Sequence, residues 1–155
     1  MIGLLQRVQR ANVDIANKQV AKIGKGLLVL IGIEHHDSER QADRLLSRLL
    51  GYRIFSDNED KMNLSLQDIN GGLLLVPQFT LVANTQKGMR PSFSSAAVPE
   101  QGRILFEYLC LQAKQQYHTV QSGIFATDMQ VSLTNDGPVT FWLQVPPNTP
   151  PGQKS

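Results

Sequence analysis

The sequence predicts a single α+β domain, with a mostly antiparallel, barrel-like β-sheet core and two main helices. Segments with the period of a strand outnumber those with the period of a helix, and only two stretches have helical spacing. Hydrophobic residues make up 41% of the 155 residues and charged residues 18%, which suits one globular domain with a substantial core. Neither an internal repeat nor a linker interrupts the chain, so we expect one domain over residues 1–145.

The first third of the chain has the pattern of β-strands. Apolar and polar residues alternate loosely over 4–15, a turn is expected at 16–18, and strand character continues over 19–33. The unbroken apolar run at 27–33 is typical of a strand that is buried on both faces.

The first helix is predicted from the change of period after residue 37. Asp37 or Ser38 provides the N-cap, Glu39 lies in the first turn, and Gly51 is the expected stop. The apolar residues on its buried face are Ala42, Leu45, Leu46, Leu49 and Leu50. Their spacing is that of one face of a helix of about four turns.

Strands and one irregular segment separate the two helices. A short strand is expected over 52–57, and a tight turn at 70–72 leads into a strand over 73–81. Residues 83–98 follow no period and predict a long loop, a kind of segment that often carries function.

The last third contains the second helix, a pair of strands and a tail. The helix is expected over 99–117, with Pro99 in its first turn. Its predicted buried face comprises Ile104, Leu105, Tyr108, Leu109 and Ala113. A hairpin-like strand pair is expected over 128–145. Residues 146–155 hold four prolines and no large apolar side chain, and are predicted to form a disordered tail.

Composition argues against a secreted, membrane-spanning or metal-binding protein. Gln6, Arg7 and Arg10 interrupt the apolar start of the chain, unlike a signal peptide, and the longest apolar run, 26–33, is too short to cross a membrane. We therefore expect a cytoplasmic protein with no membrane partner. No spacing indicates a metal site, and the apolar setting of Cys110 favours a buried thiol over a nucleophile. A net charge of +2 permits contact with nucleic acid but does not require it.

Two stretches carry polar or aromatic residues that folding alone does not explain. Strand alternation aims Gln78 and Thr80 to one side and Phe79 to the other, although an ordinary strand end would have the same pattern. The segment 87–93 combines two cations with Phe93, and an ordinary surface loop is the plain alternative.

A third stretch is the turn that contains Gly137 and Pro138. A hairpin needs only Asn-Gly or Asp-Gly at its turn. Proline adds the option of a cis peptide bond and holds a pair of backbone carbonyls at a fixed angle. The sequence has no Ser-His-acid arrangement and no glycine-rich phosphate loop. Any chemistry must therefore depend on backbone groups, a hydroxyl or the substrate itself.

Two of these stretches resemble the signature motifs of a known family. The motif "QFTL" at 78–81 together with "NDGPVT" at 135–140 is similar to the bacterial type of the D-aminoacyl-tRNA deacylase (D-tyrosyl-tRNA deacylase) family. The likeness continues through "GLLVLIGIE", "LGYRIFSD", "GMRPSF" and "DMQVSL", and so covers roughly residues 1–145.

The resemblance implies an enzyme that hydrolyses the ester between a D-amino acid and the 3′ end of tRNA. It also implies activity toward glycyl-tRNA, including glycine mischarged on alanine tRNA. A homodimer is implied, in which a cis Gly137–Pro138 turn reaches into the pocket of the other subunit. Neither a cofactor nor a metal is implied. One departure is Pro77, which stands where the family usually has serine; this disfavours a serine nucleophile and leaves a mechanism based on backbone groups intact.

These implications suggest roles for individual residues. The segment Gln78–Thr80 is the candidate catalytic set, with the N–H groups of Phe79 and Thr80 as oxyanion donors. The carbonyls of Gly137 and Pro138 are the candidate barrier against L-amino acids, because an L-configured Cβ would collide with them. The 2′-hydroxyl of the terminal adenosine would assist hydrolysis, with Thr80 as a positioning group.

Supporting roles and alternatives remain. Arg7 is expected to brace the Gly-Pro carbonyls, and Met129 and Phe93 are expected to line the adenosine or amino-acid pocket. A non-catalytic binder of the RNA 3′ end and a threonine-dependent esterase or peptidase are the alternatives.

Overall fold

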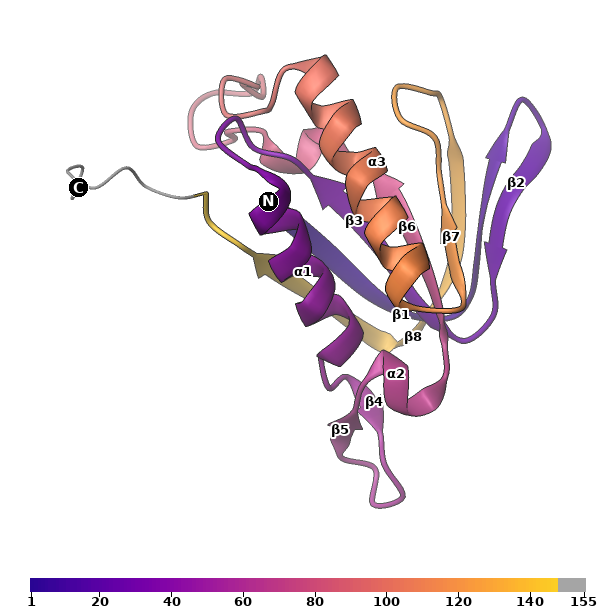
Figure 1. The fold of residues 1–155 in the computed structure, drawn as a ribbon. Helices are drawn as coiled ribbons and strands as arrows, with labels where there is room; N and C mark the ends of the chain where they lie inside the picture. Colours follow the sequence, from indigo (N-terminus) through magenta and orange to yellow (C-terminus); the bar gives the residue numbers. More distant parts are fainter. Residues whose placement is uncertain (148–155) are drawn as a thin grey trace.

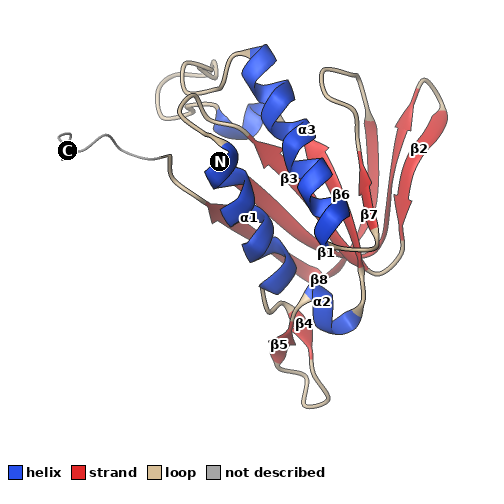
Figure 2. Ribbon diagram, in the orientation of Figure 1, coloured by secondary structure: helices blue, strands red, loops and turns tan. Residues whose placement is uncertain are grey.

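The computed structural model describes residues 1–147 as one α+β domain (Figures 1 and 2). The six strands of its main sheet are β1 (Ile2–Ile15), β2 (Lys18–Ile23), β3 (Gly26–Gly32), β6 (Gly72–Pro77), β7 (Val120–Ser122) and β8 (Gln130–Gln144). A separate small pair comprises β4 (Phe55–Ser56) and β5 (Met62–Leu64). The helices are α1 (Glu39–Gly51), α2 (Leu66–Ile69), α3 (Pro99–Gln116) and the 3₁₀ helix η1 (Phe79–Val82).

The main sheet is mixed. β1 pairs antiparallel with β2, β3 and β8, whereas β3–β6 and β6–β7 are parallel pairs. The prediction of a mostly antiparallel sheet is confirmed, and the parallel strands are an addition to it. Parallel neighbours need long crossover connections, and the segments that contain α1 and α3 provide them, so both helices lie together on one face of the sheet (Figure 2).

Two hydrophobic clusters occupy the two faces of the central strands. Leu27, Val29 and Ile31 of β3 belong to the cluster shared with α1 and α3, whereas Leu28 belongs to a cluster formed with β1, β2 and β6. This alternation fits the predicted strand buried on both faces. β2 also approaches β6 and β7, so the sheet curls around the second cluster into the predicted barrel-like shape.

Helix α1 forms as predicted. Ser38 is its N-cap and forms a capping box with Gln41. All five apolar residues predicted for its inner face are buried. Helix α3 differs from the prediction at Ile104, which is 49% exposed, and at Tyr108, which is half-buried. The buried face of α3 is instead centred on Leu105, Phe106, Leu109 and Ala113.

The prediction of a hairpin over 128–145 is wrong. Residues 130–144 form one long strand, β8, that runs antiparallel to β1 along almost its whole length. The turn-forming residues do not reverse the chain, because the segments on both sides of them pair with β1. They form a bulge instead, which interrupts the register between Gln6 and Val8 of β1.

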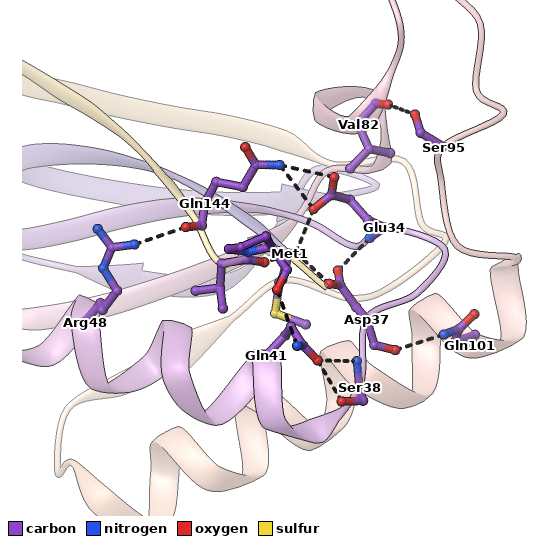
Figure 3. Close-up of polar contacts among 12 residues, drawn as sticks. Met1, Glu34, Asp37, Ser38, Gln41, Arg48, Val82, Ser95, Gln101 and Gln144 are labelled. Carbon is purple, nitrogen blue, oxygen red and sulfur yellow. Dashed lines mark hydrogen bonds and ion pairs between the residues drawn. The ribbon is translucent and has the colours of Figure 1, made fainter. Parts of the chain in front are cut away.

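A buried ion network holds the first residue at the end of the sheet (Figure 3). The Met1 ammonium lies 2.7 Å from a carboxylate oxygen of Glu34 and 2.6 Å from one of Asp37, and donates to the carbonyl of Val145 at 2.8 Å. Burial raises the pKa of Asp37 in spite of this cation. The network ties β1, the β3–α1 connection and the end of β8 together.

Among residues 1–147, no helix has both the length and the apolar character needed to cross a membrane. The same part of the chain contains no group of three or more His, Cys, Asp or Glu side chains that could hold a metal ion. Pro146 and Pro147 have no regular structure, and the rest of the tail predicted at 146–155 lies outside the described residues.

Candidate active site

The segment Gln78–Thr80 leaves the end of β6 in a tight helical turn. β6 ends at Pro77, which pairs with Ile31 of β3, and the backbone N–H of Gln78 donates to the Ile31 carbonyl at 2.7 Å. The predicted strand over 73–81 is therefore wrong beyond Pro77, because Phe79–Val82 forms η1. The change brings Gln78 and Thr80 together, and the Gln78 amide donates a hydrogen bond to the Thr80 hydroxyl.

The first N–H groups of η1 have no backbone acceptor within the described residues. A helix leaves its initial N–H groups without an acceptor in a preceding turn. Within residues 1–147, the backbone bonds of this turn are donated by Gln78, Leu81 and Ala83, and none is donated by Phe79 or Thr80. Phe79 is 60% exposed and Thr80 is also exposed. Two adjacent backbone donors on exposed residues thus have no partner in the described fold.

The predicted loop over 83–98 is folded back against η1. Asn84 and Ser92 exchange backbone hydrogen bonds of 2.7 and 3.0 Å, which close the base of the loop. Ser95 donates a hydrogen bond to the carbonyl of Val82, the last residue of η1 (Figure 3). The ring of Phe93 lies 5.2 Å from that of Phe79, measured between centroids. The structure therefore brings Phe93 to the candidate catalytic segment.

Met129 also lies near this end of β6. A β-carbon at Gly123 would be 2.7 Å from the Met129 sulfur and 3.5 Å from Cδ of Pro77, so these two side chains approach the same point. The backbone N–H of Ile124 donates to that sulfur at 3.4 Å. Met129 is half-buried and packs at the edge of the second hydrophobic cluster.

Gly137 and Pro138 lie at the exposed tip of the bulge in β8. Gln6 pairs with Thr140 and Val8 with Asn135, so residues 136–139 face the single residue Arg7. The Gly137–Pro138 peptide bond is cis, as the sequence led us to expect. Gly137 has a φ of +143°, in the region that favours glycine.

Side chains on both sides hold this bulge in place. The guanidinium of Arg7 donates to the carbonyl of Asp136 at 3.0 Å and to that of Ile54 at 2.7 Å. Arg7 therefore braces the residue before the Gly-Pro pair, and the expected bonds to the Gly-Pro carbonyls themselves are not formed. The amide of Asn135 accepts from the N–H of Val139 at 2.7 Å and donates to its carbonyl at 3.2 Å.

Asn135 is the functional residue that sequence reasoning missed. It is the first residue of the motif at 135–140, in which only Gly137 and Pro138 were assigned roles. The signal was available, because asparagine side chains commonly hydrogen-bond to the backbone of the turn that follows them. Here the amide closes the bulge across four residues and leaves Gly137 and Pro138 exposed at its tip.

In one protomer the two motifs lie apart. The bulge faces Arg7, which pairs with Leu27 at the start of β3, whereas the Gln78–Thr80 turn follows Ile31 near its end. Ile31 is four residue steps along the strand from Leu27, which corresponds to about 13 Å. Gln78, Phe79, Thr80 and Phe93 therefore lie together, with Met129 near Pro77 at the end of the same strand, and Arg7, Gly137 and Pro138 lie together at the bulge.

Comparison with known proteins places the chain in a family. Residues 4–144 match the family model described as D-Tyr-tRNA(Tyr) deacylase. A D-aminoacyl-tRNA deacylase of Pseudomonas putida is 61% identical over 145 residues, which are 94% of this chain and all of that protein. One from Klebsiella pneumoniae is 57% identical over the same shares of the two chains.

Solved structures have the same fold. The "c-Myc DNA Unwinding Element Binding Protein" superimposes with a TM-score of 0.90 and 34% identity, over 94% of this chain and 99% of the other. A protein described as a "probable eukaryotic D-amino acid tRNA deacylase" superimposes with a TM-score of 0.80 at 19% identity, over 93% and 98% of the two chains. The family model and the bacterial relatives span nearly the whole described fold, and the chain is therefore a member of the D-Tyr-tRNA(Tyr) deacylase family.

Proposed function

We propose that this protein hydrolyses the ester bond of D-aminoacyl-tRNA and releases the D-amino acid and free tRNA. The observation that carries the proposal is the open pair of N–H groups at Phe79 and Thr80, at the start of η1. The relatives named as D-aminoacyl-tRNA deacylases supply the substrate class. An enzyme with this substrate works where aminoacyl-tRNA is used, so we place it in the cytoplasm.

The two N–H groups provide an oxyanion hole. When water adds to the ester carbonyl, negative charge develops on its oxygen, and preorganised donors stabilise that charge. Removal of one such donor typically costs about 10²–10³ in rate. The donors belong to the backbone, so they are fixed by the bond from Gln78 to Ile31 at the start of the turn rather than by a side-chain rotamer.

The environment of Thr80 favours a positioning role over a nucleophilic one. Its hydroxyl accepts a hydrogen bond from the amide of Gln78. A carboxamide N–H donates and cannot take up a proton, so Gln78 cannot act as the base that a threonine nucleophile needs. The terminal adenosine carries a 2′-hydroxyl next to the ester, and this group activates or orients the attacking water in the mechanism that we propose.

The bulge supplies the stereochemical filter. The carbonyls of Gly137 and Pro138 bind the α-ammonium of the substrate and form a wall beside its α-carbon. An L-configured Cβ collides with that wall whatever side chain follows it, whereas a D-configured Cβ points away. Glycine has no Cβ and passes, so glycyl-tRNA, including glycine mischarged on alanine tRNA, is a substrate as well. A backbone wall braced by Arg7 and Asn135 cannot rotate aside as a side chain can.

The two motifs meet only if a second copy of the chain contributes one of them. They lie about 13 Å apart along β3 in one protomer, and a two-fold axis between them would bring the bulge of each copy to the Gln78–Thr80 turn of the other. The active protein is then a homodimer with two sites at its interface.

An open row of side chains lies between the motifs and supports this assembly. Leu4 of β1 pairs with Leu30 of β3 and with Trp142 of β8, so the three side chains lie next to one another across three strands. Their neighbours Leu5, Val29 and Leu143 belong to the cluster beneath the helices, so this row is on the opposite face. Trp142 is 50% exposed and the two leucines are half-buried, and a second copy would cover them.

The test is deacylation of D-tyrosyl-tRNA beside L-tyrosyl-tRNA. We expect release of D-tyrosine and no release of L-tyrosine above the spontaneous rate. Binding without turnover of either ester would favour the RNA 3′-end binder, and turnover of both would favour the threonine-dependent esterase. Sedimentation at micromolar concentration should give a dimer, and a fully active monomer would refute the shared site.

A further inference from the structure

A row of arginines follows the exposed side of α1. Arg40, Arg44 and Arg48 are spaced by four residues, so they lie on one face of the helix and rise by about 6 Å from one to the next. Arg40 and Arg44 are exposed and, within residues 1–147, neither forms an ion pair. Two cations with no acidic partner in the described fold are available to an external anion.

Some other arginines of the chain are engaged within the fold, whereas Arg10, Arg53 and Arg90 are exposed and, like Arg40 and Arg44, form no ion pair within residues 1–147. Arg48 donates to the carbonyl of Gln144 at 3.1 Å, and its guanidinium lies 5.9 Å from the centre of the Tyr52 ring. Arg103 on α3 forms ion pairs of 2.7 and 2.8 Å with Glu100 and Glu107. Arg40 and Arg44 therefore stand out by their spacing, which places two exposed cations one turn apart on the same helix face.

Separate hollows lie beside these arginines, beside the β3–α1 connection and beside the loop that packs on η1. The hollow beside α1 has a volume of about 500 Å³ and is lined by Arg40, Gln41, Asp43, Arg44, Val145 and Pro146. A second hollow is bordered by Pro147 and by Glu34, His35 and His36 of the β3–α1 connection.

Two of these hollows border the loop that packs on η1. Ser94 and Ser95 border the hollow at the histidines, and Ser92 and Lys87 border the third. Phe93, between these serines, contacts Phe79. In Figure 1 this loop and the first turn of α1 lie at the same end of the molecule. The hollows therefore border, in turn, the loop beside the Phe79–Thr80 turn, the β3–α1 connection and the arginine row.

We propose that Arg40 and Arg44 bind backbone phosphates in the acceptor stem of the tRNA whose 3′ end occupies the Phe79–Thr80 turn. This inference rests on the proposed function, because the occupant must be continuous with the substrate in the site. Phosphate contacts by exposed cations position a nucleic acid without reading its sequence. They also make binding depend on salt, by a slope of about 0.7–0.9 per phosphate contacted.

The test compares two substrates of different length. Whole D-tyrosyl-tRNA reaches α1, whereas D-tyrosyl-adenosine occupies only the site. The test variant is the double substitution Arg40→Gln/Arg44→Gln. The control is Lys18→Gln/Lys22→Gln, which removes the same charge from β2, on the opposite side of the molecule from α1 (Figure 1).

For whole tRNA we expect the arginine variant to raise KM by roughly tenfold with kcat unchanged. The slope of log(kcat/KM) against log[salt] should become shallower by about 1.4–1.8, which corresponds to two phosphates. On D-tyrosyl-adenosine the arginine variant should equal the wild-type protein, which also shows that it is folded. The lysine variant should keep the wild-type KM and salt slope on both substrates.

Three results would overturn the inference. An arginine variant with wild-type KM and salt slope on whole tRNA would refute the phosphate contacts and leave the proposed function standing. Equal losses on both substrates would place the effect in the site or the fold. A wild-type protein that cleaves neither D-tyrosyl substrate would refute the proposed function, and the inference with it.

Discussion

The substitution Gly137→Ala tests whether the shape of the bulge determines activity. A β-carbon at this position would lie 2.6 Å from Cγ2 of Val139 and 2.9 Å from the backbone N of Val139. The valine methyl can rotate away, but the backbone atom cannot, because Asn135 holds it through a 2.7 Å hydrogen bond. The φ of +143° is itself unfavourable for alanine.

The size of the effect follows from this geometry. A residue held in a sparsely populated backbone region costs about 1–3 kcal/mol, which corresponds to a fall of a few degrees in Tm for a chain of this size. The fold should therefore survive. The carbonyls of Gly137 and Pro138 should shift, and a displacement of about 1 Å in a catalytic constellation can cost roughly 10²-fold in rate. We expect a loss of about this size on D-tyrosyl-tRNA.

The assay is deacylation of D- and L-tyrosyl-tRNA together with thermal unfolding. Gly24→Ala is the matched control, since a β-carbon at Gly24 meets no atom within 4 Å, and it should leave both activity and Tm unchanged. If Gly137→Ala remains folded and retains D-tyrosyl-tRNA hydrolysis within several-fold of the wild type, the bulge is not the filter. An unchanged preference for D over L would lead to the same conclusion.

Four other experiments test separate features. Thr80→Ala keeps the backbone N–H and should retain substantial activity on normal tRNA, whereas a substrate that ends in 2′-deoxyadenosine should bind but hardly react; the reverse pattern would make Thr80 the nucleophile. Pro77→Ser should leave deacylation within several-fold of the wild type, and a gain of orders of magnitude would show that a hydroxyl is needed there. Burial raises the pKa of Cys110 to about 11, so at pH 8 about one thiol in a thousand is ionised; an aromatic disulfide reagent should label the native protein far more slowly than the unfolded one, and rapid native labelling would contradict this burial. Desolvation raises the pKa of Asp37 above 3.8, so this carboxyl is harder to ionise in the folded state than in the unfolded state. Its contribution to stability therefore falls as the pH rises from about 3.8 through the folded-state pKa. In urea titrations from pH 3.5 to 7, the difference in unfolding free energy between wild type and Asp37→Asn should decrease over that window, and an increase would contradict the direction of the shift.

Much of the local structure could be predicted from the sequence alone. The apolar spacing of α1 and the cap at Ser38 predict a helix with the inner face that the structure has, because both depend on residues within a few turns of one another. The unbroken apolar run of β3 predicted a strand with two buried faces for the same reason. The motifs at 78–81 and 135–140 identified the two stretches that we propose carry the site.

Long-range pairing decided the rest. Asn135–Pro138 has the composition of a reversal, yet β1 offers one continuous partner on both sides of it, and pairing with that partner outweighs the local preference. The parallel alignment of β3 with β6 and the exposure of Ile104 likewise depend on neighbours that are distant in sequence.

The Gln78–Thr80 turn and the brace of the Gly-Pro bulge show the same division. The sequence identified Gln78–Thr80 as a candidate catalytic segment and predicted that Arg7 braces the Gly-Pro turn. Only the tertiary structure showed that Phe79 begins a 3₁₀ helix and that Arg7 binds Asp136 and Ile54. The physical reason is that hydrophobic period and capping act over a few residues, whereas strand partners and hydrogen-bond acceptors are chosen by whatever backbone the completed sheet brings within reach.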